Sequence, residues 1–298
     1  MASSSNPPPA PPRRRRSVAD WIWFYGKRVR RLGEELGLGL RYSLQPGRRR
    51  RPPAAVRFVI YGVGRVGSEL LVELLDNHPR LRCDAEILDL PLIRPLRYAN
   101  LRSALAESPV YGFKLLTHHM LRCSRRRRGA SGESFLHRLH RDGWRILHLR
   151  RRDRLRQAVS VMASQQRKHW HHRQGDGRRP QAVQIDVPAL LQRLDFSARR
   201  QQEELAALGD LPRLELFYED HLKTFELQQA TARRVFQWLD LEPVPVSTSL
   251  VPSSPRRLED FIANYDEVER ALRGAGLDDL LPPAAAGNSP PSQPYSSP

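Results

Sequence analysis

Cysteine is scarce in this sequence. Its 298 residues include only two cysteines, Cys83 and Cys123. Two are too few for a disulfide framework, and they lie too far apart for a CxxC metal-binding motif. We therefore expect reduced thiols, no metal site, and a protein that resides in the cytoplasm.

Long apolar runs are also missing. The longest one near the amino terminus, WIWFYG, is far shorter than the ~20 residues that a membrane-spanning helix needs. Arginines precede it, but Asp20 and the lack of an apolar signal-peptide core argue against export. The sequence therefore predicts neither a membrane span nor a secretion signal.

Lysine is also rare in this sequence. The formal net charge is +18, yet among the 50 cationic residues only Lys27, Lys114, Lys168 and Lys223 are lysines. Arginine forms planar, bidentate contacts with phosphate and sulfate groups, although coding bias in a GC-rich genome produces the same excess. Residues 1–55 carry thirteen cationic residues against three acidic ones, so much of the basicity belongs to the amino-terminal segment.

Composition divides the chain into three parts. Residues 1–54 are predicted to form a disordered basic tail with one amphipathic helix and a linker, residues 55–281 a folded domain, and residues 282–298 a disordered tail. The helix is expected over residues 17–37, where apolar side chains recur at three- and four-residue spacing. Such a basic, aromatic-bearing helix either lies on an anionic membrane surface or docks on its own domain or a partner.

The folded part alternates strand-like and helical segments. Strands are expected at 56–61, 110–116, 144–149 and 213–217, and helices at 67–77, 89–106, 153–166, 188–208, 226–239 and 257–272. Strands separated by helical crossovers indicate an α/β domain with a mostly parallel central sheet. The segment HPRLRCDAEIL, which follows the first of these helices, is interpreted as a poor strand.

The stretch FVIYGVGRVGSELLVELL, residues 58–75, joins a strand to a helix through a glycine loop. By spacing alone the loop is a GxGxxG dinucleotide fingerprint, but any such loop offers backbone N–H groups and a helix dipole to an anion. A Rossmann site also needs an acid at the end of its second strand, for which Asp84 or Glu86 is available. A Walker A loop is absent, because no Gly-Lys-Ser/Thr follows at the right distance.

A second anion-binding candidate is ILHLRRRDRLRQAVSVMASQ, residues 146–165. A strand ends at Leu149, a basic cluster follows, and a helix begins near Asp153. Ser160 comes eight residues after Arg152, so the two reach one phosphate only if the chain starts extended and then folds back as a helix. The alternative is a solvated basic turn and an ordinary helical serine.

Together these segments resemble PAPS-dependent sulfotransferases, nearest to the bacterial carbohydrate sulfotransferases of the trehalose and nodulation-factor group. The loop Arg65-Val66-Gly67-Ser68 is similar to their 5′-phosphosulfate loop, and Arg152 with Ser160 to their 3′-phosphate motif. HPRLRCDAEIL, QAVSVMASQQRKHWHH, LELFYEDHLKTFELQQATARRVFQWLDLEP and RRLEDFIANYDEVERAL resemble further segments of that fold. The resemblance covers about residues 56–281 and implies a P-loop-NTPase-like three-layer α/β sandwich.

The resemblance implies transfer of a sulfonate group from 3′-phosphoadenosine 5′-phosphosulfate (PAPS) to a hydroxyl of a carbohydrate or glycolipid. The residues that it assigns to the donor are Arg65, Val66, Gly67, Ser68, Glu69, Arg152 and Ser160. Glu69 departs from many relatives, which have a small hydroxyl residue there that would add a phosphate contact. Arginines supply the positive charge, so no metal is expected.

The catalytic groups that the resemblance implies are Arg65, at the leaving oxygen, and a base. Glu86 is the first choice of base, because related bacterial enzymes carry a glutamate at the matching place. His118 or its neighbour His119 is the second, since the cytosolic branch has a histidine after a similar strand. Trp170, in the segment HWHH, either stacks on an acceptor sugar or belongs to an ordered surface loop.

Two other functions compete with this interpretation. An NAD(P)-binding oxidoreductase would use the GxGxxG loop but would have no use for Arg152 with Ser160. A polyanion binder would use the arginine runs at 13–16, 48–51 and 125–128. These runs have few interleaved aromatic residues and no nucleic-acid fold motif, so no specific nucleic-acid partner is expected.

Overall fold

The computed structural model describes residues 18–44, 54–89, 92–125, 134–167, 172–173, 182–251 and 257–282. Residues 1–17 and 45–53 of the predicted amino-terminal segment, which include the linker, residues 283–298 of the predicted carboxyl-terminal tail, and Trp170 lie outside these residues.

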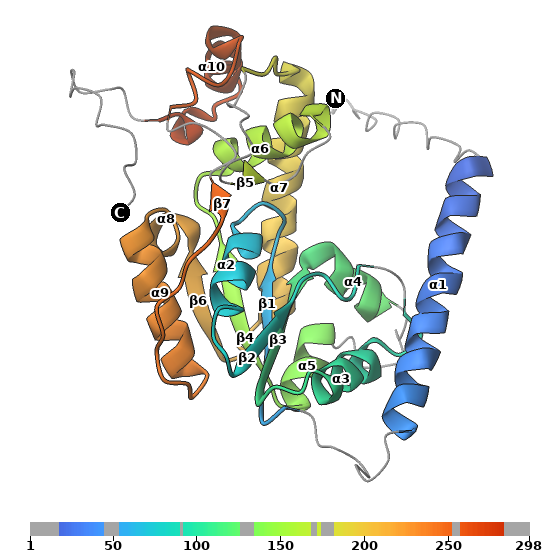
Figure 1. Ribbon diagram of the computed structural model, residues 1–298. Coiled ribbons are helices and arrows are strands. Elements are labelled where there is room, and N and C mark those ends of the chain that lie inside the picture. Colours follow the sequence, from blue (N-terminus) through green and yellow to red (C-terminus); the bar gives the residue numbers. More distant parts are fainter. Residues whose placement is uncertain are drawn as a thin grey trace, which may run out of the picture.

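A five-stranded sheet forms the centre of the molecule (Figure 1). Its strands are β1 (Val56–Gly62), β2 (Leu81–Asp84), β3 (Val110–Leu116), β4 (Trp144–Arg150) and β6 (Arg213–Phe217). They lie in the order β2-β3-β1-β4-β6, and every neighbouring pair is parallel. β1 lies in the middle and is buried from Phe58 onward, which explains its continuous apolar run, since helices must cover both faces of a parallel sheet.

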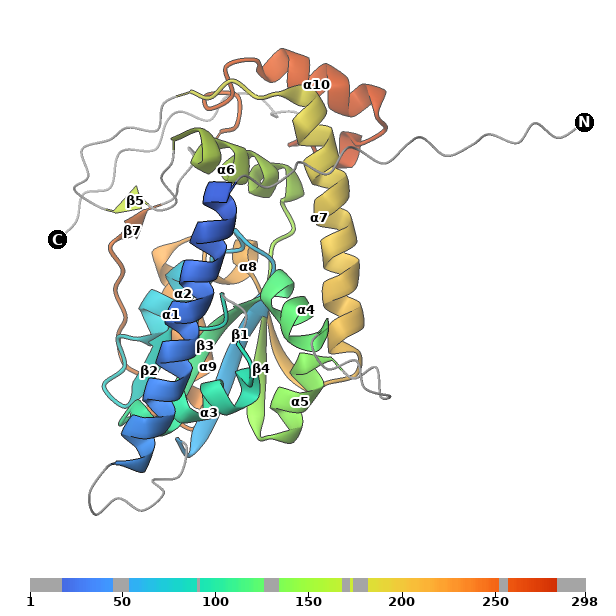
Figure 2. The same cartoon turned by 90° about the vertical axis from the view of Figure 1, so that its right-hand side faces the viewer.

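Helices cover both faces, as Figures 1 and 2 show. α2 (Ser68–Leu75) and α9 (Phe225–Trp238) pack on one face. α3 (Pro95–Leu105), α4 (Thr117–Arg125), α5 (Phe135–Arg141) and the carboxyl-terminal end of α7 (Val187–Leu208) pack on the other. The predicted P-loop-NTPase-like three-layer sandwich with a parallel sheet is confirmed.

A third apolar cluster lies beyond the carboxyl ends of the strands, at the top of Figure 2. There α6 (Arg154–Arg167) and the amino-terminal part of α7 pack with α10 (Tyr265–Gly274). The remaining elements are α8 (Tyr218–His221), the antiparallel pair β5 (His172–Arg173) and β7 (Leu250–Val251), and the 3₁₀ turn Asp278–Leu280. Because α6 follows β4 directly, this cluster covers one side of the sheet's carboxyl edge.

The amino-terminal helix α1 (Val18–Ser43) lies along the side of the molecule (Figure 1) and contacts α3. The carboxylate of Glu35 accepts hydrogen bonds from the backbone N–H groups of Ile93 and Arg94, at 3.1 and 3.0 Å. These donors precede α3, so Glu35 ties the two helices together. None of the helices in the described ranges is long and apolar enough to cross a membrane.

The structure differs from the sequence expectations at short elements. The interpretation of HPRLRCDAEIL as a poor strand is wrong, because it contains β2, whose Cys83 N–H donates to Asp76 Oδ1 at 2.9 Å. Four residues are too few to show the alternation that identifies a strand. α3 begins at Pro95 and α10 at Tyr265, both later than expected. α4 and α5 have no predicted counterpart, since each is shorter than the window in which helical periodicity is detectable.

At the centre of the sheet, one position should tolerate no larger side chain without a loss of stability. Gly112 of β3 faces Phe58 of β1, and a methyl group on Gly112 would overlap the Phe58 ring. We expect Gly112→Ala to lower the free energy of unfolding by about 2 kcal/mol, the usual cost of overpacking a core. Urea unfolding followed by circular dichroism measures this change.

Gly274→Ala is the matched control. A methyl group there meets nothing within 4 Å, so the free energy of unfolding should stay the same or rise slightly. Equal destabilisation by both substitutions would contradict the packing argument.

Candidate functional site

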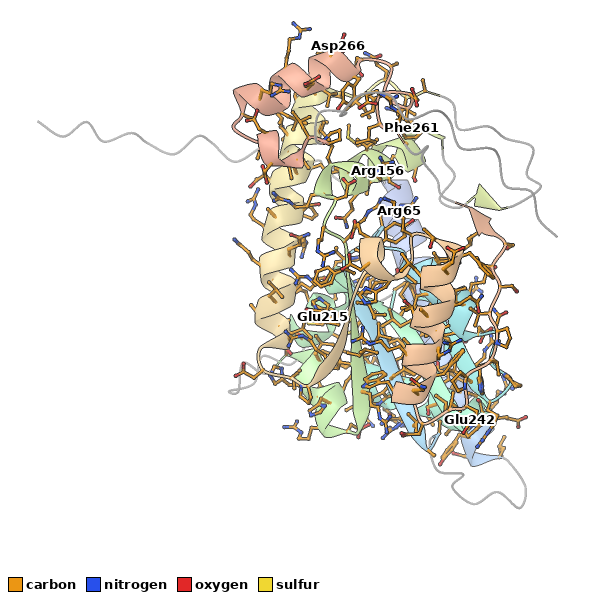
Figure 3. The ribbon with its side chains drawn as sticks, turned by 90° about the vertical axis from the view of Figure 1, so that its left-hand side faces the viewer. Arg65, Arg156, Glu215, Glu242, Phe261 and Asp266 are labelled. Carbon is orange, nitrogen blue, oxygen red and sulfur yellow. The ribbon has the colours of Figure 1, made fainter. Side chains whose placement is uncertain are left out.

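A cavity of about 590 Å³ opens at the carboxyl edge of the sheet. Its walls come from the loop after β1, the end of β3, the start of α6, and one face of α7. Figure 3 shows Arg65 at this edge, below the helix that carries Arg156. Ligands of open α/β sheets bind outside the carboxyl ends of the strands, so this cavity is the candidate site.

The glycine loop forms one wall of the cavity. Gly67 has a φ of 89° and precedes α2, and a Cβ there would lie 2.6 Å from the ring of Tyr218, so only glycine fits. Val66 is fully buried and Ser68 nearly so, which fixes the loop to the body of the protein. The first N–H groups of a helix have no acceptor within the helix, and those of α2 begin at Ser68, beside the cavity.

Arg65 is the cation at the centre of this loop. Its guanidinium donates to Ser160 Oγ of α6 from Nε at 3.1 Å and from Nη2 at 2.9 Å. Its φ of 65° is unusual for a residue with a side chain. Burial, together with the positive charge of Arg151, lowers the pKa of Arg65, although a guanidinium still keeps its charge.

Arg151 lies next to Arg65. Its Nη1 donates to the carbonyl oxygen of Arg65 at 3.1 Å, and its guanidinium lies 4.7 Å from the ring centre of Tyr218. Its side chain is only 10% exposed, and burial lowers its pKa too. The nearest carboxylate that forms an ion pair with Arg151 is Glu219, at 3.7 Å. The site thus holds two neighbouring, partly buried cations, and an anion between them would relieve their repulsion.

The structure does not bring Arg152 and Ser160 together. Arg152 pairs with Asp220 at 2.6 Å and lies over the ring of Phe217, while Ser160 binds Arg65. Both members of the Arg152–Asp220 pair are about half exposed, and solvent weakens exposed ion pairs. The assignment of Arg152 to a 3′-phosphate stays a prediction, which requires this weak pair to open.

Lys114 lies between two carboxylates at the end of β3. Its Nζ is 2.7 Å from Glu69 Oε2 and 2.9 Å from Glu86 Oε1. Burial alone would lower the pKa of Lys114, but hydrogen bonds and charge from Glu69 and Glu86 raise it overall. The Lys114 N–H also donates to the carbonyl oxygen of Ala85 at 3.3 Å, so β3 holds the Glu86 loop at the cavity.

His118 and His119 begin α4, but only His118 lines the cavity. His119 is buried, with Nε2 at 3.6 Å from Glu86 Oε2, and its Nδ1 has no hydrogen-bond partner within the described part of the chain. Burial, the neighbouring His118 and nearby cations lower the pKa of His119 to about 3. Partial burial, then Arg122, lowers the pKa of His118. Both rings are therefore neutral near pH 7.

The far wall of the cavity is formed by α7. The site residues on this helix were not predicted from the sequence. Arg193, Phe196, Ser197 and Arg200 line the cavity at i, i+3, i+4 and i+7, one face of the helix. Phe196 is 48% exposed, and the Arg200 guanidinium lies 4.9 Å from its ring centre. The available sequence signal was this spacing of arginines and an aromatic residue along a polar helix face.

The arrangement disagrees with a dinucleotide site. In a Rossmann sheet the second strand lies beside the first, whereas here β3 lies between β1 and β2. Asp84, the acid at the end of β2, is buried and bonded to Arg102 at 2.5 Å and to the Tyr111 hydroxyl at 2.8 Å. Asp84 is not part of the cavity wall, so it is not placed to bind a ribose.

No group of three or more His, Cys, Asp or Glu side chains in the described residues is arranged to hold a metal ion. Of the segment HWHH, residues 169–171 lie outside the description, and His172 is described only as part of β5. The predicted acceptor role of Trp170 stays a prediction.

Comparison with known proteins gives one family. Residues 89–204 match the model of the Stf0 sulphotransferases, and no curated protein matches the chain. A sulfotransferase from Alicyclobacillus acidocaldarius is similar in structure, with 12% identity over 74% of this chain and 95% of that one and a TM-score of 0.40. That likeness is too low to carry an argument.

The family match begins after Glu86 and extends almost to the end of α7. It therefore includes Lys114, His118, Arg152 and Ser160, together with the α7 face, and it excludes the glycine loop. The match confirms the resemblance found in the sequence: residues 89–204 match the Stf0 sulphotransferase family, which indicates a sulfotransferase.

Proposed function

We propose that this sulfotransferase uses PAPS as its donor and transfers the sulfonate group to a hydroxyl of a carbohydrate or glycolipid. The observation that carries the proposal is the partly buried pair Arg65 and Arg151 beside the amino terminus of α2. Like charges that are held together in a partly buried site favour an anionic ligand, and a helix amino terminus adds N–H donors. A phosphosulfate group meets both conditions.

The reaction requires the acceptor oxygen to form a bond with sulfur while the bond from sulfur to the 5′-phosphate oxygen breaks. Negative charge then grows on the leaving oxygen, which departs as 3′-phosphoadenosine 5′-phosphate. Arg65 and the N–H groups at Gly67 and Ser68 are assigned to this oxygen, where prepositioned donors contribute several kcal/mol. Lys114 is assigned to the sulfonate oxygens, since its Nζ lines the same cavity.

The proton of the acceptor hydroxyl is assigned to Glu86. Its side chain lines the cavity, where Lys114 holds one carboxylate oxygen at 2.9 Å and the other lies 3.6 Å from His119 Nε2. His118 is the competing base, because it also lines the cavity and its neutral ring can accept a proton. His119 is excluded from this role by its burial behind His118, away from the cavity wall.

The acceptor is assigned to the α7 side of the cavity. Phe196 offers an exposed aromatic face of the kind on which sugar rings stack, and Arg193 and Arg200 offer hydrogen-bond donors on either side. This side also faces the base candidates, because α4 contacts α7. The donor then occupies the opposite side, formed by the glycine loop, α6 and Tyr218.

Calorimetric titration with 3′-phosphoadenosine 5′-phosphate, the desulfated product, tests the donor. We expect micromolar binding, with much weaker binding of AMP, NADH and NADPH. Arg152→Ala should weaken binding of the bisphosphate by roughly ten- to a hundredfold, because it removes hydrogen bonds to a charged group, and should leave AMP unchanged.

Asp220→Asn is the matched variant, since it frees Arg152 from its ion pair. It should leave the affinity unchanged or raise it. If Arg152→Ala has no effect, the 3′-phosphate lies elsewhere; if NADH binds instead of the bisphosphate, the donor assignment is wrong.

Turnover of PAPS with a responsive acceptor tests the base. Glu86→Gln should lower kcat by about a hundredfold or more, the usual contribution of general base catalysis, whereas His118→Gln should change kcat by less than about tenfold. A base at His118 would behave differently. Activity would then fall with decreasing pH through a pKa below 6.5, where the ring becomes protonated, and His118→Gln would remove that dependence.

Phe196→Ala tests the acceptor side. We expect KM for a sugar acceptor to rise about tenfold, on the order of the ~1–3 kcal/mol that an exposed stacking contact contributes, with no change in affinity for the bisphosphate. Phe225→Ala, an exposed phenylalanine of α9 outside the cavity wall, should change neither. Equal loss of donor affinity in Phe196→Ala would place α7 on the donor side.

A further inference from the structure

α1 carries an exposed apolar stripe. Val29, Leu36 and Leu40 of α1 are 67%, 75% and 59% exposed, and Leu44, the residue directly after α1, is 68% exposed. Their spacing of seven, four and four residues places them along one side of a helix. Exposed large apolar residues are unremarkable singly, but a continuous row indicates a contact surface.

The opposite side of α1 already has its partner. Glu35 is buried where it accepts the N–H groups of Ile93 and Arg94, and Leu38 packs against the apolar core beside α3. At 100° per residue, Glu35 lies about 100° and Leu38 about 160° from Leu36 around the helix. The contact with the domain therefore leaves the stripe pointing outward, as the position of α1 along one side of the molecule in Figure 2 allows.

The charge around the stripe is positive. Arg30 and Arg41 are exposed on α1, and Arg94 and Arg97 are exposed at the start of α3, with Arg97 beside Gly39 of α1. The two acids of α1 beyond Asp20 are engaged. Glu34 pairs with Arg30 at 3.3 Å, and Glu35 accepts backbone N–H groups.

We propose that α1 is a membrane-surface helix that binds an anionic lipid bilayer. Its apolar stripe enters the boundary between headgroups and acyl chains, and the arginines contact the lipid phosphates. A second copy of this chain is a less suitable partner for the stripe than a lipid surface. If two copies paired through this surface, Arg30 and Arg41 of one copy would face the arginines of the other, and like charges repel each other. A helix of this kind lies in the membrane plane and does not span it, in agreement with its composition.

Vesicle sedimentation with the full chain tests the proposal. We expect binding to phosphatidylcholine vesicles that contain phosphatidylglycerol, at least about tenfold weaker binding to phosphatidylcholine alone, and release by added salt. Leu36→Glu/Leu40→Glu should weaken binding to the anionic vesicles by about tenfold or more, because it places two negative charges on the inserted side.

The control is Leu205→Glu/Phe225→Glu, which makes the same charge change at exposed apolar residues on α7 and α9 and should leave vesicle binding unchanged. Calorimetry with 3′-phosphoadenosine 5′-phosphate shows whether the α1 variant is folded. Its donor affinity should equal that of the parent, so a failure here is distinct from a failure of the donor proposal.

Three outcomes would overturn the proposal. The first is unchanged vesicle binding in Leu36→Glu/Leu40→Glu, which would assign binding to the basic tail. The second is equal binding to neutral and anionic vesicles. The third is the absence of vesicle binding together with a dimer that the α1 variant converts to a monomer, which would make the stripe an interface between copies.

Discussion

This site depends on the proximity of two partly buried guanidinium groups. Arg65 and Arg151 lie side by side because the β1 loop and the β4 end meet at the same edge of a parallel sheet. Each loses solvation there, and the charge of Arg151 further lowers the pKa of Arg65. Hydrogen bonds from Arg65 to Ser160, and the ring of Tyr218 beneath Arg151, hold the groups in place. Holding two positive charges together therefore lowers the stability of the fold, and a bound anionic donor would offset this effect.

Lys114 differs from the two arginines, because carboxylates rather than a second cation lie beside it. It is a buried cation with carboxylates on both sides, so the local charge is balanced without a ligand. Glu69, at the start of α2, and Glu86, after β2, come from distant parts of the sequence and meet at this lysine. The ion pairs explain why an acid is tolerated at position 69, where many relatives have a hydroxyl residue. In the proposed arrangement, these ion pairs lie between the side of the cavity that binds the anionic donor and the side that contains the Glu86 carboxylate and the neutral His118 ring.

The cavity and α1 occupy different parts of the molecule. α6 and α7 build the roof and far wall of the cavity from a separate apolar cluster. α1 contacts the domain through α3, on the sheet face that α3, α4 and α5 cover. A surface contact by α1 therefore leaves the donor side unchanged.

The sequence by itself determined the parts whose causes are local. The glycine loop with Gly67 at positive φ, the following helix, and the four longer strands were all predictable, because turn geometry and hydrophobic periodicity act over a few residues. The four-residue β2 was not predictable in this way, since only its pairing with β3 stabilises it.

Only the tertiary structure decided which groups meet. The resemblance assigned Ser160 and Arg152 to one phosphate, but the fold places Ser160 against Arg65, which is far away in the sequence, and turns Arg152 toward Asp220. The α7 face with Phe196 became part of the site only when α7 packed across the strand ends. The physical reason is that a contact between distant segments depends on sheet order and helix packing, which no short sequence window contains.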